Sequence, residues 1–265
     1  EDYWFAVNGS SLPENLQGVR SRADEISEKY GVRILLSSQC LPACTFAEYP
    51  TTTTDQMDLA DEAASINAAL DSLEEALSLY PEGFFPQFRS EFGDGGIRIM
   101  LVGGFESNFN MIGYSVQNSL WHNIYVDIFS EGLVGTYCHE IWHATEDHIT
   151  SINYGEFDVV QWAELNPVGF QYIFDPAESI LNEGDYTYFG STKPKDCYFI
   201  DGYAKTNERE DRARIMEYAM TGFFGSELSE YPHLYAKLRY MSDKIRQYFD
   251  TTGWSTPRWE DALGE

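Results

Sequence analysis

Residues 138–148 read CHEIWHATEDH and hold three of the chain's five histidines together with three acids. Apolar residues at helical spacing run through this stretch and predict a helix over about 131–148. On a helix, His139 and His143 lie one turn apart and project from the same face, so both imidazoles can reach one metal ion. The stretch therefore predicts a helix that carries two metal ligands.

Glu140 stands beside the first histidine of this pair. Its carboxylate can lie near the open coordination position of the metal and take a proton from a water molecule whose pKa the metal lowers. Residues 139–143 read HEIWH and match the HExxH motif of zinc peptidases. A chance match in a chain with five histidines has a probability on the order of one in a hundred, so the motif favours a metal site over a solvated surface helix.

A catalytic zinc site needs a third protein ligand, with the fourth position left for water. Residues 146–148 are near but poorly placed, because Glu146 lies one turn beyond His143 and its side chain points back over that histidine. We expect Glu146 or Asp147 to support an imidazole or to be solvated. Ile149 occupies the position of the third histidine of a metzincin, which excludes that class.

Glu164, in the stretch QWAELNP (161–167), is one candidate for the third ligand. It stands 21 positions after His143, close to the spacing of thermolysin-like peptidases. It lacks the asparagine that precedes the glutamate in that group, and Pro167 shortens any helix on which it lies. Glu164 therefore stays an alternative third ligand.

A later stretch carries the other candidate. Residues 203–220 read YAKTNEREDRARIMEYAM and predict a helix over 207–220. Together with the HExxH motif, this stretch resembles a group of gluzincin-type zinc metallopeptidases: the peptidase domain of anthrax lethal factor, the Pro-Pro endopeptidases and predicted zinc-binding metallopeptidases of gut bacteria. The resemblance rests on Tyr203, Thr206, Asn207, Glu208, Glu210, Asp211 and Ala213.

In that group a tyrosine stands seven residues before the glutamate that completes the zinc site. The resemblance implies one Zn²⁺ per chain, held by His139, His143 and Glu210, and implies that Tyr203 polarises the scissile carbonyl. A carboxylate suits a catalytic His₂Glu set, and a phenol can donate a hydrogen bond to the oxyanion of the transition state. From the residues alone, Glu210 can instead belong to the acidic first turn of a helix that begins at Asn207, and Tyr203 can be a core residue.

The chain departs from the pattern of this group in two ways. The group usually has a second acid four residues after the ligand glutamate, where this chain has Arg214. If that acid orients a zinc ligand, Asp211 or Asp147 must replace it, or the zinc affinity is lower here. The separation of 67 positions between His143 and Glu210 exceeds the spacing expected for this group and implies an inserted segment. This segment can form a wall or lid over the site or can be ordinary packing, and both alternatives stay open.

Hydrophobic periodicity predicts an α+β fold with a mainly helical C-terminal half and a small mixed sheet in the N-terminal half. The resemblance implies that this is a zincin-like metallopeptidase fold. We expect one domain over 1–265, in two lobes of about 1–150 and 151–265 with the active-site cleft between them. Residues 40–55 predict a surface loop, and no structure is predicted over 151–202. Helices are predicted over 19–30, 59–80, 131–148, 207–220 and 232–248, and strands over 32–37, 97–104 and 119–129.

The chain carries 43 acidic and 17 basic residues and a formal net charge of −26, spread along its length. This charge repels phosphate backbones and anionic lipids, so neither nucleic acid nor a membrane surface is expected as a partner. No segment reaches the roughly 18 apolar residues of a membrane-spanning helix. The chain begins at Glu1 without a leader, and we expect an exported protein whose signal has been removed.

The chain has four cysteines, Cys40, Cys44, Cys138 and Cys197, which permit up to two disulfides. Cys40 and Cys44 can close a small loop, but the sequence leaves the pairing open. A thiolate zinc site is disfavoured because no second close pair of cysteines exists.

These observations predict a zinc-dependent endopeptidase that acts on peptide or protein substrates. Glu140 is the expected general base and Tyr203 the expected oxyanion donor. The strand over 119–129 is a candidate cleft edge for β-pairing with an extended substrate, and His122 on it has no assigned role. Two alternatives stay open: a catalytically inactive zincin-like binding or scaffold module, which Arg214 favours, and a zinc amidase acting on non-protein amides.

Overall fold

The N-terminal half is built on a small mixed sheet. Its four strands are β1 (Arg33–Leu36), β3 (Gly96–Val102), β6 (Trp121–Asp127) and β5 (Gly113–Asn118), in that spatial order. β1, β3 and β6 run parallel, and β5 pairs antiparallel with β6. Every residue of β3 and all but the last of β6 are buried, as expected for strands covered on both faces. Two shorter strands, β2 (Thr51–Thr52) and β4 (Gly104–Phe105), form a separate antiparallel pair.

The computed structural model describes residues 12–45, 47–107, 111–153, 157–175, 188–189 and 194–264. The chain divides into two compact units. The first unit holds residues 1–78 and 82–140, and the second holds 79–81 and 141–265. The predicted single domain with a cleft between two lobes stays a prediction.

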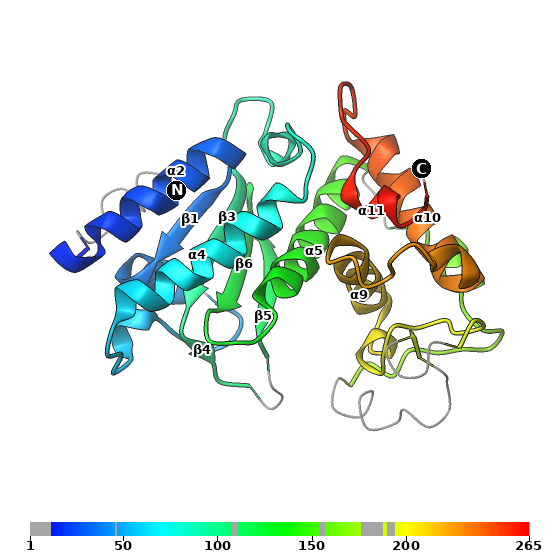
Figure 1. Ribbon diagram of the computed structural model, residues 1–265, viewed down its shortest axis with the longest axis horizontal. Coiled ribbons are helices and arrows are strands. Elements are labelled where there is room, and N and C mark those ends of the chain that lie inside the picture. Colours follow the sequence, from blue (N-terminus) through cyan, green and yellow to red (C-terminus); the bar gives the residue numbers. More distant parts are fainter. Residues whose placement is uncertain are drawn as a thin grey trace. The chain divides into compact units, whose positions relative to one another are not determined.

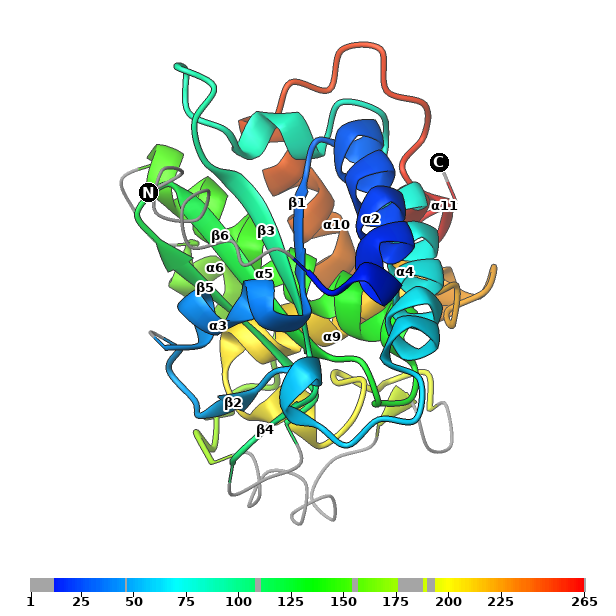
Figure 2. The same cartoon turned by 90° about the vertical axis from the view of Figure 1, so that its left-hand side faces the viewer.

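The first unit contains two long helices, α2 (Gln17–Tyr30) and α4 (Glu62–Ser78), which lie side by side in Figures 1 and 2. α2 ends at Gly31, whose φ of 76° gives the left-handed cap that the sequence predicts. α4 buries an apolar stripe and ends before Pro81. Shorter helices of this unit are η1 (Glu14–Leu16), η2 (Ser37–Cys40), α3 (Leu41–Cys44), η3 (Thr54–Gln56) and η4 (Phe85–Phe88).

Helix α5 (Leu133–Asn153) follows the sheet, and its residue 140 closes the first unit. The described elements of the second unit that come after α5 are all helical. They are α6 (Val159–Glu164), η6 (Tyr203–Lys205), α9 (Glu208–Met220), η7 (Leu228–Glu230), α10 (Pro232–Tyr248) and α11 (Arg258–Asp261). The predicted α+β class, with a small mixed sheet and then helices, is therefore confirmed.

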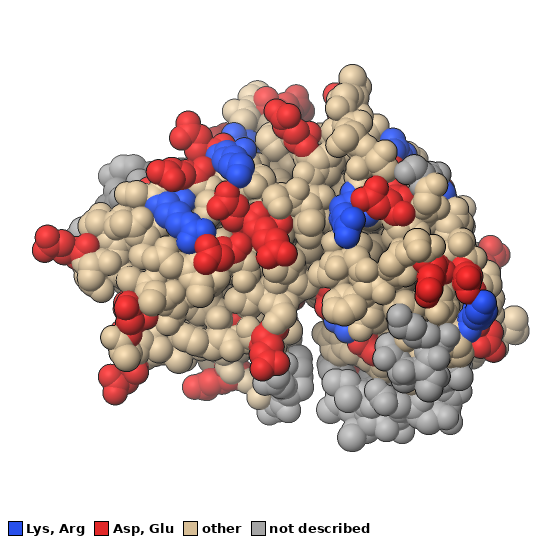
Figure 3. Space-filling model, in the orientation of Figure 1, with Lys and Arg blue, Asp and Glu red and all other residues tan. Residues whose placement is uncertain are grey.

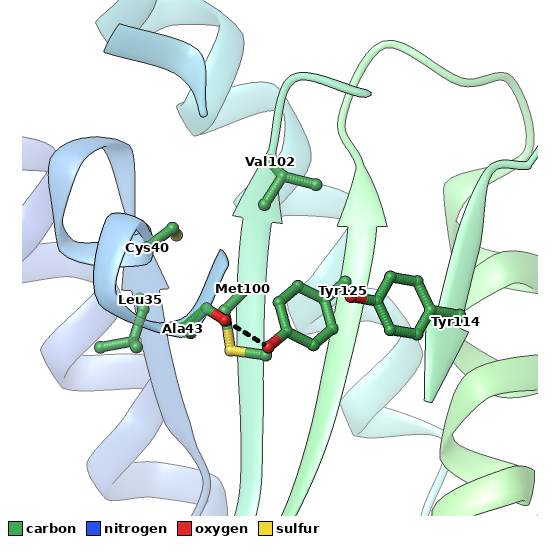
Figure 4. Close-up of a cluster of buried hydrophobic side chains, with 7 residues drawn as sticks. All are labelled: Leu35, Cys40, Ala43, Met100, Val102, Tyr114 and Tyr125. Carbon is green, nitrogen blue, oxygen red and sulfur yellow. Dashed lines mark hydrogen bonds between the residues drawn. The ribbon is translucent and has the colours of Figure 1, made fainter. Parts of the chain in front are cut away.

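A cluster of buried side chains joins the sheet to the segment after β1 (Figure 4). The rings of Tyr114 and Tyr125 stack, with centroids 4.6 Å apart and planes 8° apart. The hydroxyl of Tyr125 donates a hydrogen bond to the carbonyl oxygen of Ala43 at 3.2 Å, so the α3 segment is tied to β6. The cluster comprises Leu35, Cys40, Ala43, Met100, Val102, Tyr114 and Tyr125.

The structure corrects the expected surface loop over 40–55. Pro42 opens the short helix α3, and Thr53 with Gln56 forms a capping box around η3. Thr53 and Thr54 are buried, and Thr54 donates a hydrogen bond to Glu62 at 2.6 Å. This stretch lacks periodicity because its turns are held by caps and side-chain hydrogen bonds.

The structure also corrects the expected edge strand. β6, within the predicted strand 119–129, lies between β3 and β5, so both of its sides are already paired. The edge on this side of the sheet is β5, which the sequence did not predict because residues 113–118 are mostly polar. A tight turn in which Ser119 has a φ of 57° joins the two strands. His122 is buried in β6 and packs edge-on against Phe88.

The surface of the protein reflects its excess of acidic residues. Acidic side chains are scattered over the face shown in Figure 3, together with fewer basic ones. In the described part of the chain, no helix is long and apolar enough to cross a membrane.

All four cysteines are thiols, and burial raises the pKa of Cys44 to about 12 and that of Cys197 to about 11. Neither of these two is therefore a thiolate at neutral pH.

Candidate metal centre

Helix α5 carries the HExxH motif at its most buried part. Every residue from 135 to 146 is buried, so the helix is covered all round rather than on one apolar side. His139, Glu140 and His143 are only 8%, 4% and 7% exposed. Because an isolated buried ionisable group is costly, three of them in one turn require partners or a bound ion.

Helix α9 supplies the third member of the group. Asn207 caps this helix, and its side-chain oxygen accepts hydrogen bonds from the backbone amides of Arg209 and Glu210 at 2.9 and 3.0 Å. The cap therefore comes from Asn207 and leaves the Glu210 carboxylate for another role. Glu210 lies in the first helical turn, with its side chain 17% exposed.

His139, His143 and Glu210 converge on one point. One ligand atom of each residue lies within 4.8 Å of those of the other two. The His143 Nε2 to Glu210 Oε2 distance is 3.4 Å. Two ligands of a tetrahedral zinc ion are about 3.4 Å apart when each bond is about 2.1 Å. The three residues therefore fit a metal ion, and two imidazoles with a carboxylate are a donor set that zinc accepts.

Glu140 lies against the edge strand of the sheet. A Cβ added to Gly113, the first residue of β5, would lie 3.1 Å from Glu140 Oε1 and 3.1 Å from the carbonyl oxygen of Tyr125. The constraint here is space and not backbone conformation, because a side chain at this position would force one of these neighbours to shift and Gly113 is not among the positive-φ residues. Sequence reasoning missed Gly113, whose only signal is a glycine at the start of an unpredicted strand.

The other candidates from the sequence lie outside this group. Glu164 is exposed at the end of α6. Glu146 and Asp147, expected to support an imidazole or to be solvated, pair instead with arginines of α9. His148 packs against Phe249, and burial lowers its pKa to about 4. The alternative third ligands are thus not brought to His139 and His143.

Tyr203 begins η6, which contacts α9 just before its cap. Asp201 accepts a hydrogen bond from the backbone amide of Ala204 at 3.0 Å and so holds the start of this turn. The side chain of Tyr203 is half-buried. Its expected role as oxyanion donor stays a prediction.

Arg214, the residue that departs from the expected acid, does not enter the group of three. Its Nε donates to Asp201 Oδ2 at 2.9 Å, and its Nη1 pairs with Glu217. Asp211, a suggested replacement for the missing acid, is fully buried and accepts from Lys237 Nζ at 2.7 Å and from the Tyr172 hydroxyl at 2.9 Å. Asp211 therefore joins α9 to α10 rather than orienting a ligand.

Comparisons of the chain with protein-family models, with characterised proteins and with solved structures find no match. The resemblance to the lethal factor group thus rests on the residues of the two motifs. Parts of the predicted inserted segment (154–156, 176–187 and 190–193) lie outside the described residues, so a wall or lid there also stays a prediction.

Proposed function

We propose that the chain is a zinc-dependent endopeptidase with a zincin-like fold. The observation that carries this proposal is the convergence of His139 and His143 with Glu210, which stands 67 positions further along the chain. Such a group arises from tertiary structure and not from the local motif. A matching carboxylate from a separate helix therefore independently supports the interpretation of the HExxH motif as part of a metal site.

In the proposed reaction, His139, His143 and Glu210 hold the zinc ion. When bound, zinc supplies a Lewis acid that polarises the scissile carbonyl and lowers the pKa of water. Glu140 takes a proton from the attacking water and delivers it to the leaving nitrogen. Tyr203 donates a hydrogen bond to the oxyanion as charge develops there.

The edge strand β5 is the proposed docking site for an extended substrate. Within the described residues β5 pairs with β6 alone, so its other side offers backbone donors and acceptors. The strand begins at Gly113, beside Glu140. A peptide that pairs with β5 would thus run past the proposed base.

Hydrolysis of a broad peptide library, before and after removal of metal with a chelator, tests this function. We expect cleavage by the zinc-loaded protein, loss of cleavage after chelation, and recovery when zinc is returned. A parallel digest of peptidoglycan separates a peptidase from an amidase. Zinc binding without cleavage of either substrate would favour the binding-module alternative.

We predict that Gly113→Ala lowers kcat for peptide hydrolysis by about 10- to 100-fold while zinc stays bound. The added methyl group meets the Glu140 carboxylate and the Tyr125 carbonyl at 3.1 Å, so the carboxylate must move. Steady-state kinetics with zinc content measured in parallel checks this. Gly18→Ala is the matched control, because a Cβ at Gly18 meets nothing within 4 Å. An unchanged kcat in Gly113→Ala would mean that Glu140 does not act from this position.

A further inference from the structure

Two arginines of α9 face two acids of α5 on either side of Glu210. Arg209 Nη2 lies 2.8 Å from Asp147 Oδ1. Arg212 Nη2 and Nε donate to the two carboxylate oxygens of Glu146 at 2.5 and 3.1 Å. Both ion pairs therefore join the turn that follows His143 to the turn that carries Glu210.

The Glu146–Arg212 pair is the more buried of the two. Its side chains are 6% and 3% exposed, whereas that of Arg209 is 43% exposed. The guanidinium carbon of Arg212 lies 4.8 Å from the ring centre of Phe157 and 5.0 Å from that of Trp162. A planar guanidinium with two parallel hydrogen bonds and aromatic rings around it has one available orientation.

A buried ion pair is a weak source of stability, because apolar residues of the same volume commonly stabilise a core as well or better. What the pair does provide is position. A helix that slips by one residue moves by about 1.5 Å, which is enough to break a ligand set. A shift of that size would change the distance of 3.4 Å between His143 Nε2 and Glu210 Oε2, which suits two ligands of one zinc ion.

Arg214, four residues after Glu210, pairs with Asp201 and Glu217. Asp211 is engaged with Lys237. We propose that the Glu146–Arg212 pair is the positioning device of this metal centre, which holds Glu210 at His143 and so sets the zinc affinity. This inference rests on the proposed function, since it concerns the same site.

The test compares Glu146→Leu/Arg212→Met with wild type. The double substitution removes the paired geometry and leaves the net charge of the protein unchanged. The zinc dissociation constant is measured by competition with a chromophoric chelator, and the site geometry by the visible spectrum of bound Co²⁺. We expect affinity to fall about 10- to 100-fold with an altered Co²⁺ spectrum, and the urea midpoint of the metal-free protein to stay close to that of wild type.

Arg246→Met/Glu260→Met is the matched control. This pair is also bidentate, lies in the same unit on α10 and α11, and contains none of the proposed ligands. Its zinc affinity is expected to equal that of wild type. Arg212→Lys, which keeps the charge and loses the two-pronged geometry, is the second variant in case the double one does not fold. We expect it to bind zinc more weakly as well.

Wild-type affinity and an unchanged Co²⁺ spectrum in both the double variant and Arg212→Lys would overturn the inference and leave the proposed function intact. A wild type that binds no zinc would instead overturn the proposed function itself. The two failures are therefore distinguishable.

Discussion

Glu140→Gln is expected to lower kcat for peptide hydrolysis by about 10²- to 10⁴-fold and to leave one zinc ion bound per chain. Glutamine keeps the shape of the side chain but cannot accept the proton of the attacking water. Zinc stays because Glu140 is not one of the three residues whose ligand atoms converge. Single-turnover kinetics and elemental analysis of the same preparation measure both effects.

Glu164→Gln is the matched control for this substitution. Glu164 is an exposed glutamate at the end of α6 and lies outside the group of three, so neither kcat nor zinc content should change. If Glu140→Gln kept more than about a tenth of the wild-type activity, Glu140 would not be the general base.

Lys237→Met is expected to lower the free energy of unfolding by about 3–5 kcal/mol. Lys237 and Asp211 are both fully buried, and Lys237 Nζ donates to Asp211 Oδ2 at 2.7 Å and to the carbonyl oxygen of Tyr198 at 2.8 Å. Removal of the ammonium group leaves a buried carboxylate without its counter-ion. Urea unfolding of the metal-free protein measures the loss without a contribution from zinc binding.

Asp211→Asn/Lys237→Met is the companion variant. The asparagine side chain can still accept the Tyr172 hydrogen bond, and neither position 211 nor position 237 then carries a buried charge. We expect this double variant to recover most of the stability that Lys237→Met loses. A loss below about 1 kcal/mol in Lys237→Met would contradict the buried ion pair, because partners of such a pair are strongly interdependent.

The long helices were predictable because each carries a local signal. α10 follows its apolar stripe over the whole predicted range, and α9 begins where Asn207 provides a cap. α5 extends to Asn153, beyond the predicted end at His148, and Ile149 in this extension is buried. In contrast, β5 is polar and has no periodic signal, and it becomes a strand only because it pairs with β6.

The candidate site was predictable where its residues stand at the spacings of known metal sites. His139 and His143 follow from helical geometry, and Glu210 follows from the resemblance. The Glu146–Arg212 pair joins residues 66 positions apart, and nothing local to either residue predicts which acid meets which arginine. Gly113 was missed for the same reason, since its crowding by Glu140 arises only after β5 and α5 fold.

The most direct test of the central claim is the zinc content of wild type and Glu210→Ala, purified side by side without chelators. We predict about one zinc per chain in wild type and its loss in the variant, because two histidines alone hold zinc weakly. Full zinc occupancy in Glu210→Ala would mean that another residue is the third ligand. A wild type without zinc, even after incubation with the metal, would contradict the account.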